Sequence, residues 1–222
     1  MEWKGVATGL EHTNGLLLTG NDSMVERLVR SFWILTILLS GVPEGVACQH
    51  ILIVYHSVTG HTARLADAVA AGARGVVGSD VRLLPVDSVS HDDVAWADAV
   101  IVGSPVHSAN ISAPIVGFLN SLPFNGEMRD KIGAAFVTAG GISAGEESVQ
   151  LAILRAMLVY NMIVVGGSEW TEPFGASAVT AELPFADTAA TASIDRIFVA
   201  KGSKLGARVA EVAKRFKSGG GG

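Results

Sequence analysis

Apolar residues recur along the chain in two alternating patterns, short uninterrupted runs and longer stretches with helical spacing. The short runs predict strands buried on both faces, and they are residues 50–55, 81–86, 98–103, 131–138 and 162–166. The longer stretches place apolar side chains three and four positions apart and predict helices, at residues 62–74, 91–97, 111–121, 145–160 and 203–217. The connection 167–201 is rich in Ala, Thr and Ser, and most of it receives no assignment.

Strands that alternate with helices predict an α/β domain, a doubly wound parallel sheet with right-handed crossovers and helices on both faces. The second strand contains Pro85, which cannot donate to a sheet ladder, so this strand is expected near an edge. In such sheets, ligands bind beyond the carboxyl ends of the strands, where the strand order reverses. The loops that follow the strands are therefore the candidate site.

The first strand runs into a loop of hydroxyl residues and one glycine, and a helix follows at once. The loop consists of Ser57, Val58, Thr59, Gly60, His61 and Thr62. Amides at a helix start lack intrahelical acceptors and can bind an anion, and the hydroxyl groups add donors. The loop has neither the Lys of a P-loop nor the glycine spacing of a dinucleotide fingerprint. It fits a single phosphomonoester, such as that of flavin mononucleotide (FMN), and equally an ordinary Ser/Thr-capped turn.

Two further loops follow strands and have chemistry suited to a flat polar ring. The loop after the third strand contains Ser104, Pro105, Val106, His107, Ser108 and Asn110. Its Ser-Pro pair fixes an extended turn, and Asn110 is expected to cap the next helix. The loop after the fourth strand contains Thr138, Ala139, Gly140, Gly141 and Gly145. Its glycines free backbone groups to meet a ring edge. Three such loops at the expected strand ends form a stronger signal than any one of them.

Composition narrows the class of function. The 222 residues carry a net charge of −5, and residues 48–222 contain 13 Lys and Arg against 16 Asp and Glu. This balance is too acidic to suggest a nucleic-acid surface. Cys48 is the single cysteine, which rules out an intrachain disulfide, and the six His residues have no zinc-ligand spacing. No bound metal is expected.

The first 48 residues differ from the rest of the chain. Residues 1–23 are rich in Gly and Thr without a sustained period and are predicted to be disordered. Residues 24–48 combine a basic start, an apolar core and a small-residue exit before Cys48, the layout of a secretory signal peptide if translation starts at Met24. The apolar run is too short for a comfortable membrane span, and the alternative is a packed or interfacial apolar helix.

The limits of the functional domain and the cellular location of the protein can be predicted from these segments. Residues 49–217 form the predicted functional domain, and residues 218–222 a flexible Gly-rich tail. The segment 24–47 indicates the secretory pathway, the periplasm or membrane association. If the start is misassigned, the protein is cytoplasmic.

The three loops resemble those of the flavodoxin-like superfamily, and within it the tryptophan-repressor-binding-protein type of NAD(P)H:quinone oxidoreductases and related FMN-dependent reductases. The resemblance covers about residues 50–216 and includes Pro173-Phe174-Gly175-Ala176-Ser177, which is similar to a Pro-Tyr/Phe-Gly-Ala segment of the family. It implies a flavodoxin-like five-stranded sheet of order 2-1-3-4-5, FMN as cofactor, NAD(P)H as reductant, and a homodimer or homotetramer.

By the same resemblance, Ser57, Thr59, Gly60 and Thr62 hold the FMN phosphate. The residues implied around the ribityl chain and the ring are Pro105, Val106, Asn110, Thr138 and Gly140–Gly141.

The ring-side residues depart from the family, which has an aromatic residue where this chain has Ser108 and a His where this chain has Val159-Tyr160-Asn161. The candidate catalytic residues are Tyr160 and His107. Tyr160 either donates a hydrogen bond to a quinone oxygen or lies in the core with its hydroxyl satisfied. His107 faces either the substrate or solvent. Three other side chains are candidate replacement aromatics or core residues, namely Phe124, Trp170 and Phe174.

The leading hypothesis is a two-electron reductase with a ping-pong mechanism. NAD(P)H reduces the flavin and leaves, and a quinone or similar acceptor is then reduced on the same face. One alternative is a one-electron carrier of the flavodoxin type, which generally needs a strongly acidic docking surface and an aromatic sandwich around the ring. Another is a non-enzymatic binding protein that kept the fold.

Overall fold

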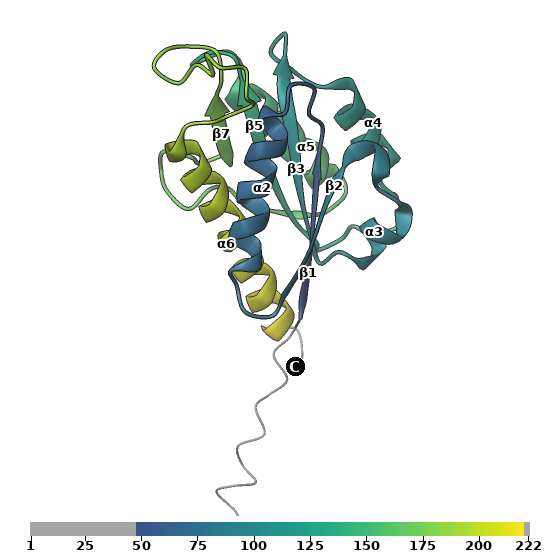
Figure 1. Ribbon diagram of the computed structural model, residues 1–222. Coiled ribbons are helices and arrows are strands. Elements are labelled where there is room, and N and C mark those ends of the chain that lie inside the picture. The colour runs from purple at the N-terminus through teal and green to yellow at the C-terminus, as the bar shows by residue number, and fades with distance from the viewer. Residues whose placement is uncertain (1–47, 220–222) are drawn as a thin grey trace, which may run out of the picture. The chain divides into compact units, whose positions relative to one another are not determined.

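A computed structural model describes residues 48–219, in which helices cover both faces of a central sheet (Figure 1). The interpretations of residues 1–23, of the signal-like segment 24–47 and of residues 220–222 lie outside the described residues.

The sheet has the order β2-β1-β3-β5-β6. These strands are parallel, and their bounds are β2 (Ser79–Pro85), β1 (Gln49–Tyr55), β3 (Ala99–His107), β5 (Ile132–Ala139) and β6 (Ile163–Val164). A further strand, β7 (Ala176–Val179), pairs with the carboxyl half of β5, so β6 and β7 share the fifth position. The predicted doubly wound order 2-1-3-4-5 is confirmed. Pro85 lies in β2, which is an edge strand as expected.

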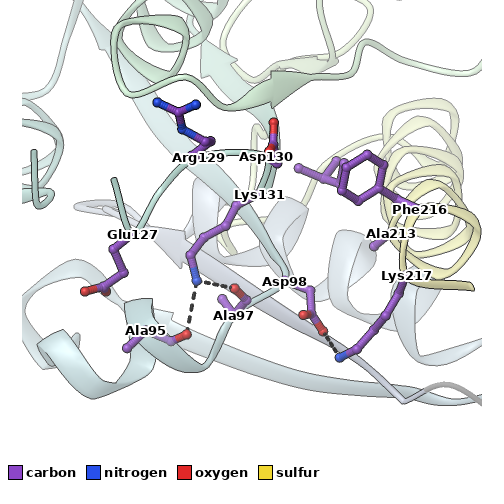
Figure 2. A pocket seen from close by; sticks show the side chains of 11 residues that line it. Ala95, Ala97, Asp98, Glu127, Arg129, Asp130, Lys131, Ala213, Phe216 and Lys217 are labelled. Carbon is purple, nitrogen blue, oxygen red and sulfur yellow. Dashed lines mark hydrogen bonds and ion pairs between the residues drawn. The ribbon is translucent and has the colours of Figure 1, made fainter. Parts of the chain in front are cut away.

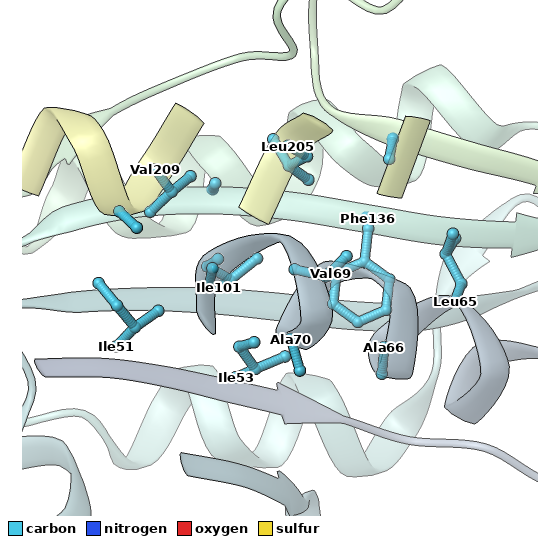
Figure 3. Packing of buried hydrophobic residues seen from close by; sticks show 14 of the residues in the cluster. Ile51, Ile53, Leu65, Ala66, Val69, Ala70, Ile101, Phe136, Leu205 and Val209 are labelled. Carbon is cyan, nitrogen blue, oxygen red and sulfur yellow. The ribbon is translucent and has the colours of Figure 1, made fainter. Parts of the chain in front are cut away.

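Alternation along the strands divides the core into two layers. Ile51 and Ile53 of β1 face α2 (His61–Arg74) and α6 (Arg196–Gly219), as Figure 3 shows. Leu52 and Val54 face the opposite layer, which contains α3 (His91–Trp96), α4 (Ala113–Ser121) and α5 (Glu146–Val159). Because β1 is apolar on both faces, it is buried between helices.

The two helices on the first face cross with almost no space between their backbones. A Cβ atom at Gly206 of α6 would lie 1.9 Å from the Val69 carbonyl oxygen, and one at Gly72 of α2 would lie 1.8 Å from the Ser203 carbonyl oxygen. Only glycine fits at these two positions, because a backbone oxygen cannot move aside as a flexible side chain can. The crossing therefore fixes α2, and with it the loop that precedes α2.

The structure corrects several predicted element bounds. β3 continues to His107 because Ser104 and Pro105 pair with β5, a contact between segments distant in the sequence. The unassigned connection 167–201 contains β7 and the start of α6, which runs from Arg196 to Gly219 rather than from 203 to 217. A single 3-10 turn, Val86–Ser88, follows β2.

Within residues 48–219, no helix is both long and apolar enough to cross a bilayer. The same residues contain no group of three or more His, Cys, Asp or Glu side chains arranged to hold a metal ion.

The close contact of α2 and α6 at Gly72 and Gly206 predicts that one added methyl group destabilises the fold. We expect Gly206→Ala to lower the free energy of unfolding by about 1–3 kcal/mol, because the new Cβ forces α6 away from the Val69 carbonyl. Gly117→Ala in α4 is the matched control, since a Cβ there meets no atom within 4 Å. That control should be neutral, or stabilising by up to about 1 kcal/mol through helix propensity. Urea unfolding measures both, and equal effects would contradict the packing account.

Candidate functional site

The serine of the first loop holds a tight turn, and Gly60 is the N-cap residue of the helix that follows. Ser57 Oγ accepts hydrogen bonds from the amides of Gly60 (3.1 Å) and Ala63 (3.2 Å). Gly60 has a φ of 94°, a left-handed conformation that glycine adopts at little cost. The amides of His61 and Thr62, in the first turn of α2, meet no acceptor in the described part of the chain. Two donors are thus left at the positive end of a helix, where anions bind.

A buried hydrogen bond joins the first loop to the third. The hydroxyl oxygens of Thr62 and Thr138 lie 2.7 Å apart, and both residues are buried. Thr138 is near the carboxyl end of β5. The hydrogen bond therefore ties the first turn of α2 directly to that end of the strand.

The second loop is a short β-hairpin, which corrects the prediction for Asn110. β3 and β4 (Asn110–Ile111) pair antiparallel through His107 and Asn110. The two residues between them, Ser108 and Ala109, both have positive φ angles (51° and 59°), as two-residue hairpin turns require. Asn110 therefore lies in a strand, where its Nδ2 donates to the Ser108 carbonyl, and does not cap α4. The N-cap position of α4 is Ser112.

The hairpin tip packs against the third loop. A Cβ at Gly145 would lie 2.8 Å from the Ala109 Cα, and Gly145 itself has a φ of 106°. Gly140 and Gly141 lie between this contact and β5; the Gly140 carbonyl accepts from the Ala181 amide, and a Cβ at Gly141 would lie 2.8 Å from the Glu182 carboxylate. The predicted loops 57–62, 104–110 and 138–147 therefore meet at one end of the sheet.

Two histidines also meet at this end, and sequence analysis identified only one of them. The rings of His56 and His107 lie edge to face with centroids 6.3 Å apart. His107 is exposed, whereas the Nδ1 atom of His56 is buried and has no hydrogen-bond partner among the described residues. The signal for His56 was its position directly after the first strand.

A further segment, residues 180–193, crosses the site; we call it the strap. Its start pairs with β5 and the third loop, since the amides of Thr180 and Ala181 donate to the carbonyls of Ala139 and Gly140. Glu182 then accepts from the Ile142 amide at 2.7 Å. Near its other end, a Cβ at Gly60 would lie 2.6 Å from the Cβ of Ala192. The strap thus contacts both the third loop and the first.

Asp187 connects the strap to the first loop electrostatically. Its carboxylate side chain is only 2% exposed and lies 3.1 Å from His61 Nε2. Burial acts to raise the pKa of this carboxyl, but hydrogen bonds from Thr191, Ser193 and His61 outweigh burial and lower the pKa to about 2. Asp187 is therefore ionised at neutral pH. Sequence analysis missed it because it lies in the unassigned connection.

Tyr160 lies at the opposite end of the sheet from these loops. It follows α5, which begins at the site and runs back toward the amino end of β5, where Asn161 accepts from the Asp130 amide. The Tyr160 hydroxyl donates to the Leu119 carbonyl at 2.7 Å, and its ring contacts Phe124. Within one chain Tyr160 therefore does not reach the loops, and the core alternative describes its place.

Two cavities on the described surface differ in their relation to the loops. One, of about 430 Å³, borders the first loop and includes His56, Ser57 and Gly60 in its lining. The other, of about 410 Å³, lies at the amino end of the sheet beside Lys131 and Lys217 (Figure 2). We place the functional site at the end of the sheet where the first cavity lies, because this cavity borders the first loop through Ser57 and Gly60.

The two lysines beside the second cavity are already bound. Lys131 Nζ donates to the carbonyls of Ala95 (3.0 Å) and Ala97 (2.6 Å), and burial lowers the pKa of this amine. Lys217 Nζ donates to Asp98 at 2.7 Å and to the Cys48 carbonyl at 2.8 Å. These contacts hold helix ends and β1 together, so both lysines have a structural role.

Known proteins are similar to this chain in sequence and in fold. The sequence profile of the family described as NADPH-dependent FMN reductase matches residues 88–177. An NAD(P)H dehydrogenase (quinone) of Geotalea daltonii is 32% identical over 143 residues, which span 52% of this chain and 70% of that protein. A flavodoxin of Aquifex aeolicus is 35% identical over 133 residues, which span 57% of this chain and 72% of that protein. The chain belongs to the flavodoxin-like family.

Solved structures agree with this membership of the flavodoxin-like family. A structure described as a flavodoxin, WrbA-like protein from Agrobacterium tumefaciens has a TM-score of 0.62 at 23% identity, and the match covers 75% of this chain and 98% of that one. This likeness confirms the fold.

The site of this flavodoxin-like chain fits FMN. The unpaired amides of His61 and Thr62, together with nearby hydroxyl groups, suit a phosphomonoester. The glycines of the third loop allow the close backbone approach that a flat ring needs. The buried, unpartnered Nδ1 of His56 is a polar atom that a bound group could satisfy.

The Thr62–Thr138 bond gives a test of how the loops are joined. We expect Thr62→Val to lower the free energy of unfolding of the FMN-free protein by about 1–3 kcal/mol, because it leaves the Thr138 hydroxyl buried without a partner. The double variant Thr62→Val/Thr138→Val should recover most of this loss, since both polar groups are then gone. Urea unfolding of the single and double variants measures the difference. Additive losses would show that the hydroxyl pair is not the linking contact.

Proposed function

We propose that the protein is an FMN-dependent oxidoreductase that passes hydride from NAD(P)H to a quinone or similar acceptor by a ping-pong mechanism. The observation that carries this proposal is the meeting of three loops, with unpaired helix-start amides, at the carboxyl ends of the central strands. The relatives named NAD(P)H dehydrogenase (quinone) and the reductase family profile support the reaction class.

The chain's own residues bind and orient. The His61 and Thr62 amides and the Thr59 hydroxyl bind the phosphate, and Ser57 holds the turn in shape by accepting the amides of Gly60 and Ala63. When bound, FMN supplies a ring that accepts hydride from one substrate and gives it to the next.

The ring side has its own candidates. Pro105 and Val106, near the end of β3, are our candidates to frame the ring, and Gly140 and Gly141 are our candidates to meet the ring edge. His107 is exposed beside His56 and is our candidate for contact with the acceptor.

The proposal predicts a yellow protein with parallel-line kinetics. Purified protein, or protein incubated with FMN, should show flavin absorption. Double-reciprocal plots for NAD(P)H at several quinone concentrations should be parallel, because the first product leaves before the acceptor binds. Intersecting lines would overturn the mechanism, and a protein that binds no FMN would overturn the function.

A variant pair ties this activity to the first loop. We expect Gly60→Ala to weaken FMN binding about tenfold, because left-handed geometry costs a non-glycine residue about 1–2 kcal/mol. Its Cβ would also lie 2.6 Å from the Cβ of Ala192. Gly126→Ala is the matched control, since Gly126 has a similar φ of 92° and its Cβ would meet nothing within 4 Å. FMN titration followed by fluorescence quenching compares the two, and equal losses would place the phosphate elsewhere.

The runner-up is a one-electron carrier, since one relative is named flavodoxin. A carrier would accumulate a stable semiquinone during reductive titration, whereas the proposed two-electron reductase would not.

We further infer that the protein forms a homodimer or homotetramer. Leu158 and Val159 of α5 are exposed, and so is Phe124, whose ring lies 4.4 Å from that of Tyr160. Such an apolar group suits a subunit contact. Light scattering of the purified protein tests the assembly.

For location, we propose that the signal-like segment 24–47 directs the protein to the secretory pathway, the periplasm or a membrane. Its basic start and short apolar core support this. N-terminal sequencing of the native protein distinguishes a removed segment from a retained one. A cytoplasmic protein that begins after this segment would contradict the proposal.

A further inference from the structure

Three side chains form a continuous hydrogen-bonded row beside the phosphate loop. Thr59 Oγ1 lies 2.8 Å from His61 Nδ1, and His61 Nε2 lies 3.1 Å from Asp187 Oδ2. Asp187 is itself fixed within the strap, where its carboxylate accepts from the Ser193 amide at 3.0 Å and from the Thr191 hydroxyl at 3.3 Å. The row therefore runs from a rigid buried carboxylate to a hydroxyl at the phosphate site.

The ionised carboxylate decides where the imidazole protons lie. Because Asp187 can only accept, the Nε2 atom of His61 carries a hydrogen. A neutral His61 then has a bare Nδ1, which accepts the hydrogen of the Thr59 hydroxyl. In that state the Thr59 hydrogen is not available to a phosphate. A protonated His61 carries a hydrogen on Nδ1 as well and donates it to Thr59 Oγ1, which frees the Thr59 hydrogen for another acceptor.

We propose that FMN binding is coupled to the uptake of one proton by His61, with Asp187 holding the imidazole in place. This inference rests on the FMN site proposed above. His61 takes the proton from solvent on Nδ1, and Thr59 turns its hydroxyl hydrogen from the ring to a phosphate oxygen. The buried Asp187 carboxylate and the phosphate dianion both favour the imidazolium. Asp187 and His61 thus act as positioning residues for the phosphate.

Other charged groups around His61 are already paired or exposed. Glu182, the second acidic residue of the strap, accepts from the Ile142 amide. Arg64 and Asp67 lie further along α2 and are exposed to solvent. His56 and His107 belong to the ring side of the site. Asp187 is the charged side chain in hydrogen-bond contact with the imidazole.

The test compares two flavins that differ only in the phosphate. Dissociation constants for FMN and riboflavin are measured by fluorescence quenching from pH 6.5 to 9, above the second phosphate ionisation at about pH 6. FMN affinity of the unmodified protein should fall with rising pH, by up to roughly tenfold per pH unit for one linked proton. Riboflavin affinity should stay flat. Calorimetry in two buffers of different ionisation enthalpy should count up to one proton taken up with FMN and none with riboflavin.

Three variants assign the proton. His61→Gln should make FMN affinity independent of pH, because the amide cannot titrate. Asp187→Asn, which keeps an acceptor but removes the charge, should move the fall in affinity to lower pH by about one unit. Glu182→Gln is the matched control, since it removes the other strap carboxylate and should keep the pH dependence of the unmodified protein.

Each outcome separates this inference from the proposed function. A protein that binds neither FMN nor riboflavin contradicts the FMN site itself. A protein that binds FMN with a flat pH profile and no proton uptake overturns the coupling alone. The coupling is also overturned if His61→Gln retains the pH dependence, or if riboflavin shows the same one. Should Asp187→Asn fail to fold, the proton count of the unmodified protein and the His61→Gln profile still decide.

Discussion

The contact between α2 and α6 at Gly72 and Gly206 is the constraint on which the site depends. Backbone meets backbone there, with room for no Cβ on either helix. The crossing holds α2 firmly against the sheet, and the first turn of α2 provides the amides of His61 and Thr62. A phosphate site built from unpaired amides needs this rigidity, because its donors are part of the main chain and cannot adjust one at a time.

Charge is distributed unequally between the two ends of the sheet. At the amino end, Lys131 and Lys217 bind carbonyls and a carboxylate and join helix ends to strands. At the carboxyl end, the loops hold no Lys or Arg, and the site relies on amides, hydroxyls and histidines. Amides and hydroxyls of this kind suit one phosphate group better than a polyphosphate, which needs cationic partners. The amino end therefore serves stability and the carboxyl end serves binding.

The sequence predicted the elements whose evidence is local. Uninterrupted apolar runs located the strands, and helical spacing located α2, α4 and α5 to within two residues. The three site loops were found because each follows a strand directly. Elements that depend on distant partners were missed. The extension of β3 needs β5 beside it, and the hairpin needs Ser108 and Ala109 in left-handed conformations that neither residue type suggests.

Within the site, the strap is likewise a segment that sequence patterns could not predict, because its contacts are with residues distant in the sequence. Asp187 and His61 are separated by 126 positions, and no periodicity links them. The site residues near the first strand could be predicted from loop chemistry, but the groups that cover them could not. For Tyr160 the error was of another kind. It was a catalytic candidate because the family has a His in its neighbourhood, but α5 carries it away from the three loops.

The division of the fifth sheet position between β6 and β7 has a consequence for self-association. A long, regular edge strand offers unpaired backbone groups to any other chain and invites fibril growth. Here one edge consists of two strands of two and four residues, separated by the excursion 165–175. The other edge, β2, ends in Pro85 and exposes Asp80. At its β6/β7 edge, the described sheet of this chain with 49% hydrophobic residues thus presents no long strand on which a second sheet could extend.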